Sequence, residues 1–315
     1  MNSLFNRAIN NKAQIIRQAM ESNKIRNNTT SMVAPGITWA LLLGAAMWGV
    51  SWYPMRLLDQ AGLSGLWLTL LIYIAAMAAS LWKTGPQLRA LWQEPRQMLL
   101  LALFAGWTNV AFVLAVLDGN IMRVLLLFYL SPLWAVILGY IFLNERLSPV
   151  SLVTLVLAMA GAVTMLWHPQ MGAPWPSSAA DWLAITSGMA FSASNVVVRK
   201  AQHINLAAKV GISWLGVIAI AVTLIVWEQQ AAPQWHADII IGAIALGVLG
   251  IAVMTTLVQY GVTHMPIHRS AVILLFELVA GAISQQLLTD EVLSMREWVG
   301  GTAIIAAAYV SAKYG

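Results

Sequence analysis

The sequence predicts an all-α integral membrane protein in which ten transmembrane helices form two inverted five-helix repeats. The first observation is composition: 60% of the 315 residues are hydrophobic and only 9% are charged, whereas a soluble domain has about a quarter charged residues. The second is that the apolar residues fall into segments of about twenty, the length that crosses a bilayer. The third is that the two halves of the chain repeat one sequence plan.

The expected membrane segments follow one another with short breaks that contain proline, glycine, asparagine or aspartate. Their predicted spans are 37–57, 65–82, 98–117, 121–142, 149–167, 181–199, 208–227, 238–262, 267–289 and 296–313. The longest loop is rich in proline, glycine and serine and separates the two halves. We therefore divide the chain into an N-terminal cytoplasmic tail (1–33), a first repeat (34–168), a periplasmic linker (169–180) and a second repeat (181–315).

The N-terminal tail is polar and basic, with apolar residues at helical spacing. This pattern is compatible with a short amphipathic helix on the inner membrane surface. Two other interpretations stay open, a disordered tail and a start at Met32 instead of Met1. The polar run before the first apolar segment is too long for a cleaved signal peptide.

The repeat is clearest in the fourth and ninth segments. Each runs from an arginine to a glutamate at the same separation, from Arg123 to Glu145 and from Arg269 to Glu291. Residues 39–56 and 182–199 show a weaker match, with Trp, Ser and Arg at corresponding positions. One interior difference between the fourth and ninth segments introduces an ionisable group: the first has Ser131 where the second has Glu277.

The basic residues indicate how the chain is oriented. If the N-terminus is inside, fourteen of the 17 lysines and arginines fall inside and three outside, as the positive-inside rule expects. Five segments per half is an odd number, so the second half enters the membrane inverted relative to the first. We therefore expect a multi-pass protein of the bacterial inner (plasma) membrane with both termini in the cytoplasm.

The same composition argues against several partners. The net charge of +5 is spread over short loops and the tail, so we expect no nucleic-acid partner. The chain has no cysteine, and no His/Asp/Glu cluster has the spacing of metal ligands. A P-loop is also missing from the sequence. We therefore expect no cofactor and no metal site.

Glu277 is the strongest functional candidate in the sequence. It lies well inside the ninth segment, where a charged carboxylate costs a few kcal/mol unless it is neutral, paired or hydrated. A carboxyl group at that depth can exchange protons or hold a cationic substrate, so Glu277 is a candidate proton-coupling and substrate-binding residue. The alternative is a structural carboxylic acid bonded to a neighbouring helix.

Aromatic and polar residues at similar depths suggest a mixed cavity. Tryptophans usually gather at the membrane interfaces, and interior ones can line a cavity and stack on flat or cationic molecules. For each single residue, packing against a neighbouring helix is the alternative. With Glu277, the candidate substrate-binding residues are Trp48, Trp52, Trp107, Asn109, Tyr129, Ser131, Trp134, Phe191, Asn195, Gln259 and Tyr260.

The charges at the ends of the fourth and ninth segments suggest two ion pairs. If these segments pack antiparallel, Arg123 meets Glu291 at the outer face and Arg269 meets Glu145 at the inner face. The alternative is that each charge anchors its own helix at the interface.

The chain resembles the EamA-type members of the drug/metabolite transporter (DMT) superfamily. The resemblance rests on WALLLGAAMWGVSW in the first segment, on RVLLLFYLSPLWAVILGYIFLNERLS in the fourth, and on its echo RSAVILLFELVAGAISQQLLTDEVLS. It covers about residues 33–315, and the second copy departs from it where Glu277-Leu278 replaces the Ser-Pro pair. The resemblance implies a secondary carrier and not an enzyme, one that exports small metabolites such as amino acids or drug-like compounds by alternating access.

Two other classes remain as alternatives. A flippase for a lipid-linked substrate is compatible with this fold, whereas an intramembrane enzyme is less so. Gly62-Leu63-Ser64-Gly65 matches a rhomboid-like motif, but the expected topology places Ser64 a membrane thickness away from His264 and His268, and a nucleophile needs its base within hydrogen-bond reach. The expected partners are a small-molecule substrate and membrane lipid, and the chain is expected to act as a monomer or homodimer.

Overall fold

The computed structural model describes residues 35–63, 65–119, 121–167, 175–289 and 292–314. The chain forms two units, residues 1–36 and 37–315, and all the packing described below lies in the second. The predicted tail (1–33), the first part of the predicted linker, Ser64 and Glu291 lie outside the described residues.

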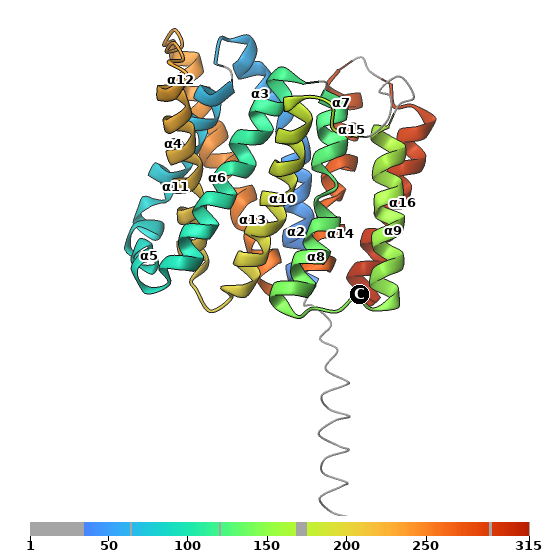
Figure 1. Cartoon of the computed structure of the whole chain (residues 1–315). Coiled ribbons are helices and arrows are strands. Elements are labelled where there is room, and N and C mark those ends of the chain that lie inside the picture. The colour runs from blue at the N-terminus through green and yellow to red at the C-terminus, as the bar shows by residue number, and fades with distance from the viewer. Residues whose placement is uncertain (1–34, 64, 120, 168–174, 290–291, 315) are drawn as a thin grey trace, which may run out of the picture. The chain divides into compact units, whose positions relative to one another are not determined.

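The regular structure of the described residues is helical throughout (Figure 1). The first half contains α2 (Pro35–Val50), α3 (Trp52–Gln60), α4 (Gly65–Thr84), η1 (Gly85–Arg89), α5 (Ala90–Gln93), α6 (Pro95–Asp118), α7 (Ile121–Phe128), α8 (Ser131–Leu143) and α9 (Pro149–Leu166). The second half contains α10 (Ala179–Lys200), α11 (Leu206–Trp227), α12 (Ala237–Ala245), η3 (Leu246–Ile251), α13 (Ala252–His264), α14 (Ile267–Leu274), α15 (Phe276–Leu288) and α16 (Met295–Tyr314).

Seven helical segments of the described chain are long and apolar enough to cross a membrane. The other three expected segments are helical too, as α2–α3, α10 and α16, but they carry more polar residues or are interrupted. Pro54 offers no backbone N–H for the fourth residue before it, and the helix is interrupted just there, between α2 and α3. The all-helical fold is thus observed, and the number of ten transmembrane helices stays a prediction.

Two pairs of corresponding helices pack against each other between the halves. α9 lies against α16 and α4 against α11, and α6 also lies against α10. Gly161 of α9 and Gly300 of α16 face each other: a Cβ added at Gly161 would lie 2.6 Å from the carbonyl oxygen of Gly300, and the reverse distance is 2.5 Å. Small residues permit this approach, which is how helices pack in lipid.

Corresponding helices of the two halves run in opposite directions. In Figure 1, α3 lies at the upper edge, so α2 runs upward toward it. α10 starts beside the start of α7 and ends beside the end of α8, as ion pairs at both places show. The α7–α8 pair and α10 therefore run parallel, downward in Figure 1. α10 thus runs opposite to α2, its counterpart in the first half.

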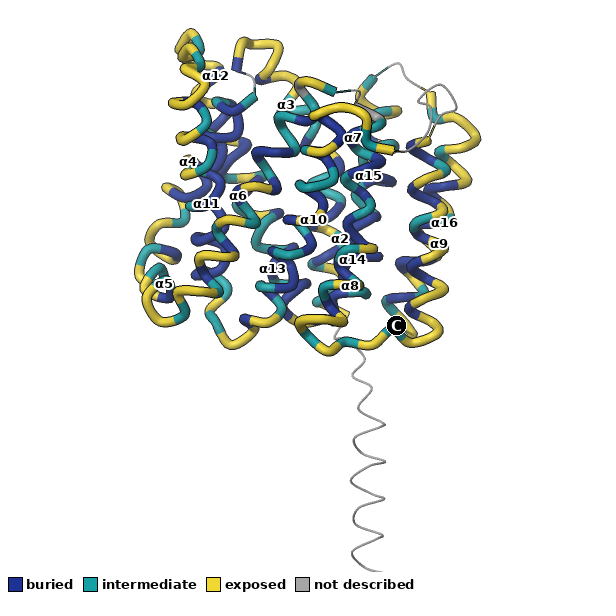
Figure 2. Tube along the Cα trace, viewed as in Figure 1, coloured by how far each residue is buried: buried dark blue, intermediate teal, exposed yellow. Residues whose placement is uncertain are grey.

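The buried apolar residues form two large clusters on either side of the α10 region. One is built mainly on α4, α11 and α12–α13, and the other on α7–α9 and α14–α16. Figure 2 shows that many outward-facing residues of the peripheral helices are exposed. They include large apolar side chains such as Val153 and Val156 of α9 and Ile241 and Ile244 of α12. So much exposed apolar surface is unfavourable in water and fits a lipid surrounding.

Candidate functional site

The fourth and ninth membrane segments are each interrupted within their length. The fourth segment breaks between α7 and α8, at Tyr129 and Leu130, and the ninth breaks between α14 and α15, at Leu275. At both breaks a backbone N–H bonds to the carbonyl three residues earlier instead of four. Leu130 N–H bonds to the carbonyl of Leu127 (3.3 Å), and Leu278 N–H to that of Leu275 (3.1 Å). The breaks occur at corresponding positions of the repeat, so Ser131 and Glu277 both lie in the first turn of the helix that follows.

Proline does not explain both breaks. Pro132 lacks a backbone donor and can hinge the fourth segment, but the ninth has Leu278 at the corresponding position and is interrupted as well. Both breaks coincide with a close approach of a neighbouring helix. The Ser192 hydroxyl of α10 donates a 2.7 Å hydrogen bond to the carbonyl oxygen of Ser131, and Gly49 of α2 lies directly against the carbonyl oxygen of Glu277.

A narrow cavity lies between the two interrupted segments and α10. The space open to the centre of a water molecule is about 20 Å³, which is room for about one water molecule. Both halves of the chain line the cavity. The lining residues are Phe128, Tyr129, Ser131, Pro132 and Ala135 from the first half, and Phe191, Ser192, Asn195, Ile267, Ser270, Ala271, Leu274, Leu275 and Glu277 from the second.

Glu277 and Tyr129 face each other in this cavity. The Tyr129 hydroxyl group interacts with the Glu277 carboxyl group, so one ionisable group from each interrupted segment meets the other here. Glu277 is partly buried and Tyr129 is buried. The position of Glu277 in the first turn of α15 is favourable for negative charge, because the backbone N–H groups at a helix start carry partial positive charge.

The rest of the cavity wall contains both aromatic and polar residues. The rings of Phe128 and Phe191 lie 5.7 Å apart and form an apolar wall. Asn195 of α10 and Ser270 of α14 are buried polar residues in the lining. An apolar wall with a few convergent polar groups is the usual composition of a small-molecule site.

The structure brings five of the twelve predicted substrate-binding residues into this cavity. They are Tyr129, Ser131, Phe191, Asn195 and Glu277. The other seven do not line it: Trp48, Trp52, Trp107, Asn109, Trp134, Gln259 and Tyr260. A role for these seven in substrate binding remains a prediction.

Several of those seven residues bond to neighbouring helices. The Trp52 indole N–H donates to the Ser284 hydroxyl (2.9 Å), and the Tyr73 hydroxyl donates to Asn109 Oδ1 (2.7 Å). Gln259 Nε2 donates to Ser213 Oγ (2.8 Å).

The remaining predicted residues also contact other parts of the bundle. The Trp107 indole N–H donates to Thr186 Oγ1 at 3.3 Å, and the Tyr260 ring lies 4.5 Å from that of His264. Trp48 packs against the α4/α11 cluster, and Trp134 has a buried indole nitrogen without a hydrogen-bond partner in the described residues.

A second hollow of about 550 Å³ lies between α3 and α12–η3. Its lining is apolar apart from Asp238. It offers few polar groups to orient a substrate, so the cavity at the interrupted helices is the better candidate site.

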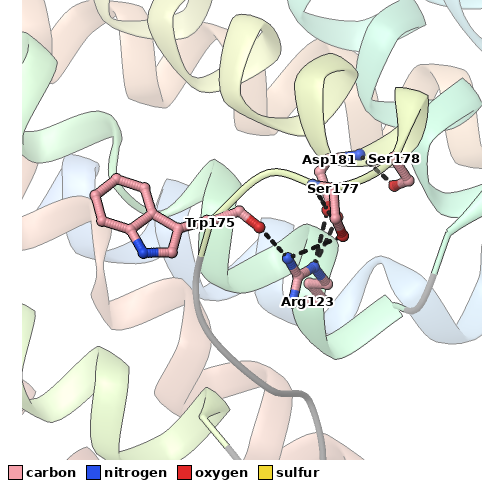
Figure 3. Close-up of polar contacts among 5 residues, drawn as sticks. All are labelled: Arg123, Trp175, Ser177, Ser178 and Asp181. Carbon is pink, nitrogen blue, oxygen red and sulfur yellow. Dashed lines mark hydrogen bonds and ion pairs between the residues drawn. The ribbon is translucent and has the colours of Figure 1, made fainter.

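Arg123 joins the start of α7 to the start of α10. Its Nε lies 2.9 Å from both carboxylate oxygens of Asp181, and its Nη2 bonds to the carbonyl oxygen of Trp175 (Figure 3). The backbone N–H of Ser177 donates to Asp181 Oδ2 at 2.8 Å, and Asp181 N–H bonds to the Ser178 hydroxyl at 3.1 Å. The predicted partner Glu291 lies outside the described residues, so the pairing of Arg123 with Glu291 stays a prediction.

Glu145 makes the corresponding contact at the other end of α10. Arg199 Nε donates to Glu145 Oε1 at 3.2 Å, and the backbone N–H of Ile267 donates to Oε2 at 2.7 Å. Arg269, the predicted partner of Glu145, is buried and bonds to the carbonyl oxygen of Ala312. The two ion pairs therefore stand at the two ends of the seam between α7–α8 and α10. The pairing of Arg269 with Glu145 stays a prediction.

Sequence reasoning missed Asp181, Arg199 and Lys209. The repeat matched Arg199 to Arg56 but offered no partner for it. Lys209 lies at the start of the predicted segment 208–227 and is completely buried in α11, where its Nζ donates to Thr263 Oγ1 (2.7 Å) and to the carbonyl of Val198 (3.3 Å). Both acceptors lie in the last turns of α13 and α10, where the partial negative charge of a helix C-terminus favours a cation.

The enzyme alternative gains no support from the described residues. Ser64 lies outside them, and His264 Nδ1 is engaged by the carbonyl of Tyr260 at 2.7 Å. No group of three or more His, Cys, Asp or Glu side chains within the described ranges is placed to hold a metal ion.

The fold and the cavity define a multi-pass helical membrane protein whose two halves enclose a small, mainly apolar cavity with a few polar groups between interrupted helices. The model of the EamA-like transporter family matches residues 34–167 and again residues 178–312. The chain therefore belongs to the EamA-like transporter family, and the resemblance seen in its sequence is confirmed.

Three known proteins similar to this chain illustrate the match, and two of them are transporters by name. An uncharacterized transporter of Archaeoglobus fulgidus is 23% identical over 225 residues, 71% of this chain and 79% of the relative. One of Pseudomonas aeruginosa is 26% identical over 182 residues, 55% of this chain and 58% of the relative. Protein RarD of Salmonella typhi is 32% identical over 84 residues, 26% of this chain and 29% of RarD.

A solved crystal structure has the same fold. It superposes with a TM-score of 0.69 over 87% of this chain and 94% of its own, at 18% identity. The likeness shows a shared architecture of the helices.

Proposed function

We propose that the protein is a secondary transporter of the bacterial inner membrane that exports small metabolites, such as amino acids or drug-like compounds, by alternating access. The observation that carries this proposal is the cavity between the two interrupted segments. Discontinuous helices at the interface of inverted repeats are the usual place for substrate and coupling ions in secondary transporters. The cavity walls come from both repeats, so a relative movement of the repeats changes the site.

The small size of the cavity supports a cycle with an occluded state. Its room for about one water molecule is far below the 300–1,000 Å³ typical of small-molecule pockets. A metabolite therefore needs the walls to separate before it enters. In this proposal the structure represents a closed stage of the cycle, and access opens when α8 or α14 moves away from α10.

Glu277 is the proposed proton-coupling residue. It is the carboxyl group of the cavity wall, and it faces a hydroxyl group that can stabilise it in either protonation state. A carboxyl group at this place can bind either a proton or a cationic group of the substrate. Competition between the two for one site would couple export to proton entry.

Proton flux in proteoliposomes tests the proposal. The purified protein is reconstituted with an internal pH dye, and tyrosine, lysine and the aromatic cation ethidium are added in turn. We expect at least one probe to evoke proton movement, and Glu277→Gln to abolish it because the amide cannot exchange a proton. Glu228→Gln is the matched control, since Glu228 lies exposed at the end of α11 and should transport as the unmodified chain does.

Two results would contradict parts of this proposal. Substrate uptake with no proton movement would leave a uniporter and make Glu277 a substrate anchor or a structural acid. Proton-coupled uptake in Glu277→Gln at the rate of the unmodified protein would remove Glu277 from the mechanism.

A further inference from the structure

Glu145 connects more helices than any simple anchoring role requires. Asn144 ends α8 in the left-handed conformation (φ 54°, ψ 26°), which asparagine tolerates better than most residues. The backbone N–H groups of Asn144 and Glu145 both bond to the carbonyl of Gly139. This turn directs the Glu145 side chain back across the end of the helix bundle.

The Glu145 carboxylate binds groups of two other helices. Oε1 accepts from Arg199 of α10 at 3.2 Å, and Oε2 accepts from the backbone N–H of Ile267, the first residue of α14, at 2.7 Å. His268 Nδ1 lies 3.8 Å from Oε2. Arg199 Nη1 in turn donates to the carbonyl of Thr263, at the end of α13, at 2.9 Å. One carboxylate and one guanidinium group thus hold four helix ends together.

These helix ends lie directly next to the cavity. Ile267 lines the cavity and is the residue whose N–H is held by Glu145. Gly139 of α8 lies in direct contact with the Ile267 side chain. The walls formed by α8 and α14 therefore cannot separate on this side while Ile267 stays bonded to Glu145 and α8 stays bonded to α10.

We propose that Glu145 is a latch residue that keeps the cavity closed toward the side where α8 and α10 end. The inference deepens the proposed transport function, because it names the contact that must break for access from that side. The groups facing Glu145 in this latch are Arg199 of α10, with Ile267 and His268 of α14. The exposed fraction is 17% for the Glu145 side chain and 22% for that of Arg199, so solvent screens their ion pair only in part.

Cysteine accessibility tests the latch. The chain contains no cysteine, so Ala271→Cys adds a single reporter in the cavity wall. Labelling by a membrane-impermeant maleimide is followed in inside-out and right-side-out vesicles. We expect Glu145→Gln to raise the labelling rate about tenfold from the side where α8 ends, which corresponds to about 1.4 kcal/mol, and to lower it from the opposite side.

Graded and control variants make the result specific. Glu145→Ala should raise the rate further than Glu145→Gln, because alanine also loses the acceptor for Ile267 N–H. Glu94→Gln removes the carboxylate of an exposed contact with His203 (3.6 Å) and should change nothing. A second reporter, Ala76→Cys, lies fully buried in α4 away from the cavity and should stay unlabelled in every variant.

Two outcomes would overturn the latch. One is an unchanged labelling rate from both sides in Glu145→Gln and Glu145→Ala. The other is equally faster labelling of Ala76→Cys, since this would mean general loosening of the fold. Labelling requires neither a substrate nor a proton gradient, so the latch can fail while Glu277-coupled transport stands, and the reverse.

Discussion

At the scale of single residues, the buried charges are explained by where helices end. Asp181 is accompanied by an arginine, a backbone N–H and a hydroxyl group. Lys209 and Arg199 reach carbonyl oxygens in the last turns of α10 and α13. Placing a charge inside a membrane protein is costly unless such partners exist. These residues therefore couple neighbouring helices through their ends rather than through the middle of the membrane.

The first prediction concerns the Arg123–Asp181 pair. Asp181→Asn leaves a mostly buried guanidinium group without its counter-charge, and removal of one partner from a buried pair costs about 3–5 kcal/mol. Because the Arg123 side chain is 15% exposed, we expect the lower end of that range. Thermal unfolding in detergent should show a clearly lower midpoint for Asp181→Asn.

The control for this prediction is Asp238→Asn. Asp238 also lies in the first turn of a helix, but it is exposed, so its substitution should move the midpoint little. Equal midpoints for the two variants would mean that the ion pair contributes nothing to stability.

The sequence predicts how deep in the membrane the site residues lie. It does not predict which side of its helix each residue faces. The repeat placed Ser131 and Glu277 at corresponding positions, and both line the cavity. Trp52, Trp107 and Gln259 also lie inside their helices but bond to other neighbours. In a membrane helix the lipid face and the packed face are both apolar, so hydrophobic periodicity does not tell which side a residue faces. Contacts such as Arg123–Asp181 depend on helix arrangement and leave no local pattern.

At the scale of helices, all ten expected segments are helical in the described chain, yet proline accounts for only some of their internal breaks. Pro54 and Pro132 mark two of the breaks. The break before Phe276 and the π-helical turn of η3 have no proline. Because these interruptions arise where another backbone approaches closely, they are properties of the packed pair of helices rather than of one sequence segment.

The second prediction follows from the break without proline. Pro132→Leu gives the fourth segment the residue type of the ninth, which is interrupted all the same. We expect the break at Leu130 to persist, so hydrogen exchange of the amides around Leu133 should stay faster than that of Val136 and Ile137. An exchange rate at Leu133 as slow as in the middle of α8 would mean that Pro132 alone causes the break.

The third prediction concerns the contact of α9 with α16. Gly300→Ala places a methyl group 2.5 Å from the carbonyl oxygen of Gly161, so the two helices must move apart, at a cost of about 1–3 kcal/mol. We expect a lower unfolding midpoint. Gly301→Ala is the matched control, because its methyl group would meet Val279 at an ordinary 3.7 Å.

The two glycine variants share any gain in helix propensity. Alanine is favoured over glycine by about 1 kcal/mol inside a helix, so Gly301→Ala should be neutral or slightly stabilising. If Gly300→Ala were as stable as Gly301→Ala, close contact between α9 and α16 would not contribute to stability.

At the scale of the whole molecule, the repeats are similar in plan and different in detail. The Ser192 hydroxyl holds the carbonyl of Ser131, and Gly49 lies against the carbonyl of Glu277 at the related place. The carbonyl of Ser131 thus accepts a hydrogen bond, whereas the carbonyl of Glu277 lies in close contact with a glycine. The two repeats therefore contact their neighbouring helices in different ways at related places beside the cavity.

The last prediction concerns the orientation of the two repeats in the membrane. Gln202 lies in the connection between α10 and α11, and Ala231 in the connection between α11 and α12; both are exposed. They stand at opposite ends of α11, one of the segments long enough to cross the membrane. The excess of basic residues on one side predicts that Gln202 faces the cytoplasm. An impermeant maleimide added to intact cells should therefore label Ala231→Cys and not Gln202→Cys, and inside-out vesicles should reverse the result. Labelling of both variants from the same side would contradict a membrane-spanning α11, and the reversed result would place the basic loops outside.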